Sequence, residues 1–388
     1  MIPLGYLLNT AIMTRDFASS PYGCVRYRSR PWAAIISKLG TNAFAEDGSM
    51  YEAFGEQLKQ GLLRPLLDTA IAEAPPAEWP AFEANALREV ATAAMHAAWT
   101  CFGRQIFHFS AALIEEFRQT DVDASSFEQL HLPYRAFFLH FGRLPDTQFD
   151  EYSRESPEYV DGAYVFRDGT DSLVFELTLS RAGTAPSLLP GIQIVIPPEF
   201  QTLGAREAID RAIDQSMNSK PPALDSEKPE TLGAALDASR REFLESARSP
   251  LIQVACLLSN CLFYLSEYGK DRTSDVEVNA PKDLVGKYLN SAGKQQHKTA
   301  QSLFGEGFSV VNYVGKGFEL PPLSIDAENG TLAPHWRRGH WRNHRHGPAL
   351  KQVKRLWIRP VLVRSDLGPS DKGHIYNVPG DASEETPR

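Results

Sequence analysis

The fold is decided by residues 162–179, which read GAYVFRDGTDSLVFELTL. Residues 162–166 and 173–179 are rich in β-branched and aromatic side chains. Residues 167–171 between them supply the Asp and Gly that turns favour. This pattern predicts a β-hairpin.

Two shorter apolar runs flank this hairpin in the sequence. Residues 136–141 are apolar and aromatic, and residues 192–196 form a further run that ends at Pro197 and Pro198. Each run has the length and composition of a strand. We therefore predict a mainly antiparallel sheet of about four strands, followed by a helix over residues 205–217.

Helical spacing dominates on both sides of the predicted sheet. Over residues 82–119, apolar side chains recur in steps of three and four, which predicts one long helix or a pair. Residues 232–247 and 251–267 predict two more helices separated by Pro250, because proline interrupts a helix. The second of these is apolar nearly all round, so we expect it to be buried.

These elements predict an α+β protein with a helical N-terminal part, a mainly antiparallel sheet, further helices and a C-terminal basic β-hairpin. The predicted organisation is a helical region (1–124), a sheet core with a helix (125–218), a linker (219–231), a helical region (232–330), a basic Trp/Arg/His hairpin (331–365) and a disordered tail (366–388).

The overall composition limits what the chain can bind. Its 388 residues carry a formal net charge of −8, so contact with nucleic acid must be local. The four cysteines form no CxxC pair, and no transmembrane segment or signal peptide is recognisable. We expect a cytoplasmic protein without a cofactor or a bound metal.

The local candidate is residues 334–364, PHWRRGHWRNHRHGPALKQVKRLWIRPVLVR. This segment holds nine Lys and Arg, four His and three Trp but no acidic residue. Without those nine charges the rest of the chain carries −17. Residues 335–342 and 352–363 predict two strands, with Gly347 and Pro348 in the connection. Pro360 suggests an edge position for the second strand.

The chemistry of this segment favours nucleic acid or ribosome contact. Guanidinium groups bind phosphate in a bidentate manner, and tryptophan faces can stack on bases, which fits single-stranded RNA better than a duplex groove. Two other interpretations remain open: the tryptophans form a hairpin core with arginines stacked on them, or the arginines bind an acidic peptide. The predicted nucleic-acid contacts are Arg337, Arg338, His340, Trp341, Arg342, Arg345, Lys354 and Arg355.

An enzymatic alternative is a metal-independent ribonuclease. His335 and His340 would exchange a proton while an arginine stabilises the phosphorane. A zinc site built from the four histidines is disfavoured, because the neighbouring arginines repel a cation. A DNA-binding regulator is the third possibility, and we expect a binding protein rather than an enzyme.

The residues Pro334 to Trp341, followed by Trp357, Pro360 and Val363, closely resemble the C-terminal signature of the second type V-A anti-CRISPR family. The sequence from Leu130 to Pro133 and the apolar helix before Tyr268 resemble it more weakly, so the likeness spans about residues 125–364. The chain departs from the family pattern over residues 342–346, which are more basic.

The resemblance implies a silencer carried by a phage or plasmid. Such a protein recognises the N-terminal peptide of a type V-A CRISPR nuclease as it leaves the ribosome, and the encoding mRNA is then destroyed. The expected partners are therefore a target protein or nascent peptide, together with RNA or the ribosome. The target of this chain can differ from that of its relatives, because specificity changes on a shared scaffold.

Overall fold

The computed structural model describes residues 99, 105–142, 148–149, 158–168, 170–181, 192–218, 230–276, 280–305, 308–318 and 335–363. The predictions made for residues 1–98, for residues 219–229 of the linker and for the tail 366–388 lie outside these described residues.

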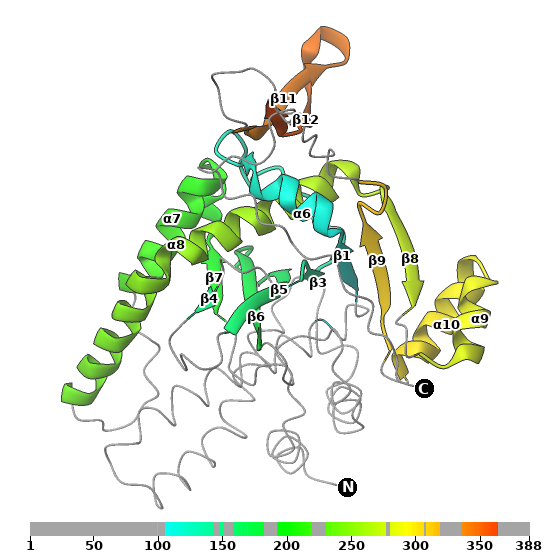
Figure 1. The fold of residues 1–388 in the computed structure, drawn as a ribbon, viewed down its shortest axis with the longest axis horizontal. Helices are drawn as coiled ribbons and strands as arrows, with labels where there is room; N and C mark the ends of the chain where they lie inside the picture. The colour runs from blue at the N-terminus through cyan, green and yellow to red at the C-terminus, as the bar shows by residue number, and fades with distance from the viewer. Residues whose placement is uncertain are drawn as a thin grey trace, which may run out of the picture.

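A mixed eight-stranded sheet forms the centre of the protein (Figure 1). Its strands are β1 (Ile106–Phe109), β3 (Ala136–His140), β4 (Gln148–Phe149), β5 (Glu158–Arg167), β6 (Leu173–Arg181), β7 (Gln193–Ile196), β8 (Arg272–Val276) and β9 (Val310–Val314). Seven of them follow the order β7–β6–β5–β3–β1–β9–β8, and β4 pairs with β5. The predicted α+β class is confirmed.

The predicted hairpin is the antiparallel pair β5–β6, in which Arg167 lies opposite Leu173. Strands β3 and β7 add to it on either side, both antiparallel. The four-stranded antiparallel part of the sheet is therefore confirmed.

Strand β1 corrects the prediction of a helix through residues 82–119. It pairs in parallel with both β3 and β9 and so lies inside the sheet. Phe107 faces one hydrophobic core and Ile106 the other, as alternate residues of a strand must. Trp99 is helical, and a separate helix, α6 (Ala111–Arg118), begins after β1, where the Ser110 side chain accepts a hydrogen bond from the Leu113 amide at 3.3 Å.

The two predicted helices around Pro250 are one continuous helix, α8 (Glu230–Tyr268). Proline removes one backbone hydrogen bond, but the helix is held here by packing: Leu251, Val254 and Leu258 are buried in the main core. By length and composition, residues 247–268 of α8 form a segment that could cross a membrane, but most of this segment is buried inside the protein. The predicted burial of this helix is confirmed.

Helices cover one face of the sheet (Figure 1). The main core joins that face to α6, α7 (Ala205–Asn218) and α8. Helices α9 (Lys282–Leu289) and α10 (Gly293–Gly305) lie beside β8 and β9 and share a smaller core with them. The predicted helical region 232–330 is thus corrected, because it also contains β8 and β9.

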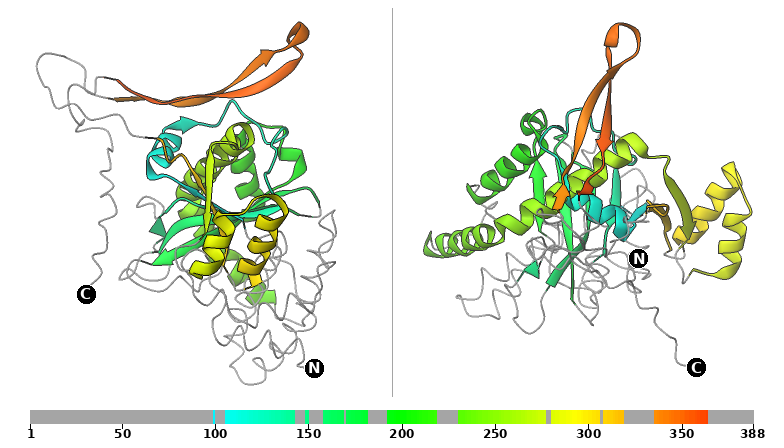
Figure 2. Two further views of the ribbon diagram at one scale, coloured as in Figure 1. Left: turned by 90° about the vertical axis from the view of Figure 1, so that its right-hand side faces the viewer. Right: turned by 45° about the horizontal axis from the view of Figure 1, so that its top comes forward.

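The C-terminal hairpin is confirmed and runs farther than expected. Its first strand is β10 (His335–Arg337) and β11 (Gly339–His346), and its second is β12 (Gln352–Ile358) and β13 (Val361–Val363). Strand β10 pairs with β13, and β11 pairs with β12, all antiparallel. A short 3-10 turn, η7 (Pro348–Leu350), closes the distal end, which projects away from the sheet and helices (Figure 2).

Candidate nucleic-acid interface

The hairpin joins the body at Gly339. Strand β11 runs parallel to the short strand β2 (Thr120–Asp121), and the Gly339 amide donates to the Gln119 carbonyl at 2.9 Å. A Cβ atom at Gly339 would lie 2.7 Å from Thr120 Oγ1 and 2.8 Å from Pro360 Cδ. The close approach of the hairpin to α6 and β2 therefore requires glycine at this position.

Trp341 anchors the hairpin to α8. Its side chain is 1% exposed, and Nε1 donates to Asn260 Oδ1 at 2.7 Å. The Asn260 Nδ2 group donates in turn to the carbonyls of Phe117 at 2.8 Å and Thr120 at 3.0 Å. Because the buried Asn260 side chain makes all three of these hydrogen bonds, it fixes one orientation of the hairpin on the body.

Trp357 and Arg359 continue the same contact. Trp357 packs against Phe117 and Trp341, and its backbone amide donates to the Tyr268 hydroxyl at 3.2 Å. Arg359 Nε donates to Glu116 Oε2 at 2.8 Å, and the Glu116 side chain is only 3% exposed. This ion pair stabilises the hairpin mainly because Glu116 would otherwise be a buried, uncompensated charge.

Arg355 also belongs to this packed part. It is 6% exposed, its Nη2 donates to the Ser126 carbonyl at 3.0 Å, and its guanidinium lies 4.2 Å from the centre of the Phe263 ring. Burial lowers the pKa of Arg355, and the negative charge of Glu267 raises it by a smaller amount. Together, residues 339–341 and 355–359 form what we call the hairpin base.

Besides the exposed His340, the base contains two of the predicted nucleic-acid contacts, Trp341 and Arg355. Their surfaces are occupied by Asn260, Phe263 and Ser126, so neither is available to an anion or a base in this structure. In the base, the two tryptophans pack on each other, and the arginines lie over phenylalanine rings of the body, Arg355 over Phe263 and Arg359 over Phe318.

Residues 342–354 behave differently, and we call them the arm. Arg342, Arg345, Lys351 and Lys354 are all exposed. Arg342 lies opposite Leu356, and His344 opposite Lys354, on one face; Arg345 lies opposite Val353 on the other. Figure 2 shows this end of the hairpin standing clear of the body. The arm thus presents cations on both of its faces.

The tip of the arm is apolar and conformationally strained. Ala349 and Leu350 both have a φ of 54°, and Gly347 has a φ of 74°. The left-handed region is unfavourable for residues with a Cβ atom, and more so for a bulky side chain. Leu350 is also 58% exposed.

The other predicted residues outside the arm lie in the base or next to it. Arg337, Arg338 and His340 are exposed. The charge of Arg338 opposes the rise in the pKa of Asp123, which burial and Asp121 produce. His335 lies in β10, opposite Val363 along the backbone. His335 and His340, the proposed ribonuclease pair, are thus placed on two successive strands separated by Arg338.

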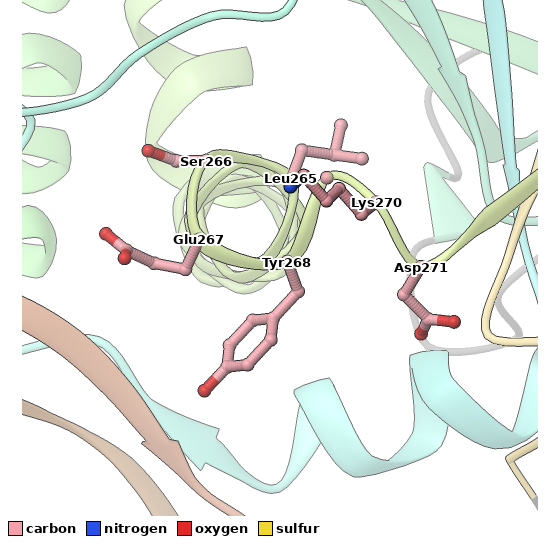
Figure 3. A pocket seen from close by; sticks show the side chains of 7 residues that line it. Leu265, Ser266, Glu267, Tyr268, Lys270 and Asp271 are labelled. Carbon is pink, nitrogen blue, oxygen red and sulfur yellow. The ribbon is translucent and has the colours of Figure 1, made fainter.

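An open hollow of about 570 Å³ lies at the C-terminal end of α8 and is lined by residues 265–271 (Figure 3). Glu267 and Tyr268 project from the last turn of the helix, and Asp271 lies in the connection to β8. The Asp271 carboxylate accepts a hydrogen bond from the Tyr264 hydroxyl. The hollow adjoins the hairpin base through the bond between the Trp357 amide and Tyr268.

Sequence reasoning missed two residues that hold the hairpin, Asn260 and Glu116. Both are buried polar residues in helices that pack on the main core. The available signal was a single Asn within the apolar residues 251–265, because a polar side chain in a buried helix needs a partner.

A mixed sheet with one helical face and a projecting basic hairpin defines an α+β protein with an exposed basic arm. Residues 107–365, well over half of the chain, match the model of the anti-CRISPR type V subtype A2 family, AcrVA2-like. The chain belongs to this anti-CRISPR family, as the sequence resemblance predicted.

No curated protein matches the chain. Three chains of solved structures do, among them the crystal structure of AcrVA2, with 13% identity over 84% of this chain and 99% of that chain. The TM-score for that pair is 0.35.

Proposed function

We propose that this anti-CRISPR protein recognises a target polypeptide as a nascent N-terminal peptide and lowers expression of its mRNA. The arm contacts RNA or the ribosome during this process. The observation that carries the proposal is the arm itself. It presents four exposed Lys and Arg side chains and no carboxylate, on a base that is packed against α6 and α8.

The electrostatics support an anionic partner for the arm. Like charges on a short hairpin repel one another unless an anion lies among them. The chain as a whole is acidic, so an attractive contact with RNA has to be confined to this basic projection. Such a contact releases counterions and therefore weakens with salt.

We further propose that the target polypeptide contacts the hollow at the end of α8. The C-terminal end of a helix carries partial negative charge, and Glu267 adds a carboxylate there. These features suit the positively charged groups of an extended peptide. Because Tyr268 connects the hollow to the hairpin base, a peptide there and RNA on the arm would lie on neighbouring parts of the molecule.

The proposal is tested by capturing the protein from a translating bacterial lysate that expresses a type V-A CRISPR nuclease, with and without RNase. Three tagged proteins are compared. The arm variant replaces Arg342, Arg345, Lys351 and Lys354 by Gln. The control variant replaces Lys282, Lys287, Lys294 and Lys298 by Gln, four exposed lysines of α9 and α10.

The wild type and the control variant should recover ribosomes together with one message and its N-terminal peptide, and should lower the level of that message. The arm variant should lose the ribosomes and the message. Recovery of only a finished protein, unchanged by RNase and by the arm substitutions, would contradict the proposal. Glu267→Gln should reduce peptide recovery without reducing ribosome recovery, which separates the two contacts.

A further inference from the structure

We infer that the ligand of the arm is folded RNA, bound on both faces of the arm and contacted at an unstacked base by the apolar tip. This inference rests on the proposed contact between the arm and RNA. It replaces the expectation from sequence that the hairpin favours single-stranded RNA.

The first argument is the position of the aromatic rings. Binding of single strands depends on aromatic faces on which successive bases stack. Trp341 is 1% exposed, and Trp357 packs among Phe117, Tyr264 and Phe318. These two tryptophans are therefore part of the protein core, and the arm beyond them contains no Phe, Tyr or Trp.

The second argument is the distribution of charge. Arg342 and Lys354 lie on one face of the arm and Arg345 lies on the other. A single strand lying along one face would leave the charges on the opposite face without phosphate partners. If the arm lies in a crevice between two phosphate backbones, the cations on both of its faces have phosphate partners. Strand residues 342–346 of the arm, at about 3.3 Å per residue, would extend roughly 16 Å into such a crevice.

The third argument is the tip. Pro348, Ala349 and Leu350 are exposed between flanking cations. An apolar side chain makes no favourable contact with a phosphate group, so these residues need another partner. Exposed apolar side chains at the ends of nucleic-acid-binding elements insert against bases. Folded RNA offers unstacked bases in bulges and loops without further cost, whereas duplex DNA must first be kinked.

The first part of the test compares three fluorescent probes by anisotropy with the full-length protein: an RNA stem with a bulge, an unstructured RNA of the same base composition, and the matching duplex DNA. The bulged RNA should bind about tenfold more tightly than either of the others. Equal or tighter binding of the unstructured RNA or of the DNA would overturn the inference, while the RNA contact of the proposed function could still stand for the unstructured RNA. Absence of salt-sensitive binding to every probe would contradict that contact as well.

The second part uses Leu350→Gly, with Leu289→Ala as the control for loss of an exposed leucine on α9. Leu289 is 54% exposed, similar to Leu350. Leu350→Gly should weaken binding of the bulged RNA about fivefold by loss of one apolar contact. The salt dependence should be unchanged, because no charge is removed, and the melting temperature should not fall, because Gly accepts a positive φ. Unchanged affinity would overturn the role of the tip.

Discussion

The base and the arm are adjoining parts of one hairpin that both contain basic residues, yet their charged groups have opposite environments. In the base, Arg355 is buried against Phe263 and Arg359 is paired with the buried Glu116. On the arm, Arg342 and Arg345 are exposed. The comparison teaches that a run of basic residues can be divided by burial into a structural half and a half that is free to bind.

The comparison predicts that the base controls stability and the arm controls binding. Each substitution below should therefore change one property and leave the other unchanged, and the expected effects are given from the largest to the smallest.

Trp341→Ala should have the largest effect on stability. It removes a fully buried aromatic side chain and leaves Asn260 Oδ1 without its donor, so we expect a loss of about 3–5 kcal/mol in the free energy of unfolding. Denaturant unfolding measures this value. Arg345→Ala on the arm is the matched control and should stay within about 0.5 kcal/mol of the wild type. Equal losses in both variants would remove the distinction between base and arm.

Glu176→Gln extends the comparison to a carboxyl group buried within the sheet. Burial raises the pKa of Glu176 to about 7, against a smaller lowering by its hydrogen bond with Gln193. Between the ordinary pKa of 4.5 and about 7, the folded protein keeps a proton that the unfolded chain has released. The stability contributed by this proton is complete below pH 4.5 and is lost as the pH rises through 7.

As the pH rises from 4.5 to 8, the free energy of unfolding of the Gln variant should therefore increase relative to that of the wild type by about 3 kcal/mol. His140 acts in the opposite direction, because burial and the nearby His108 lower its pKa to about 3 and its contribution grows as the pH rises to 6.5. The difference between the variant and the wild type removes the contribution of His140. A difference that does not change with pH would show that Glu176 is not buried as a neutral acid.

Arg359→Gln should have a moderate effect. The substitution leaves the Glu116 carboxylate buried without its cation, and the half-exposed position of Arg359 limits the loss to about 2 kcal/mol. The loss should disappear in the double variant Glu116→Gln with Arg359→Gln, which has no buried charge. A double-mutant cycle by thermal unfolding measures the coupling. Arg342→Gln is the matched arm control, and a similar loss there would argue against the assignment of Arg342 to the arm.

The sequence predicted the parts of the fold that depend on local patterns. The β5–β6 hairpin and its neighbours β3 and β7 follow from apolar, β-branched and aromatic composition and from turn chemistry over residues 136–196. Strand β1 could not be predicted in this way, because its partner β9 lies about two hundred residues further along the chain. Its apolar residues also continued the helical spacing of Leu113 and Phe117 by coincidence.

The candidate site was predicted in the same partial way. Composition located the basic hairpin, but it could not separate Arg355 from Arg345, since the distinction depends on Phe263 and Ser126. Likewise, the role of Trp341 depends on Asn260, eighty-one positions earlier in the chain. Long-range contacts of this kind cannot be read from the hairpin sequence alone.

The most direct test of the division between base and arm is the salt dependence of RNA binding, measured for the wild type and the arm variant alongside their melting temperatures. Removal of four phosphate contacts should reduce the slope of log affinity against log salt concentration by about 3, with the melting temperature unchanged. An unchanged slope, or a slope that falls only together with the melting temperature, would contradict the account.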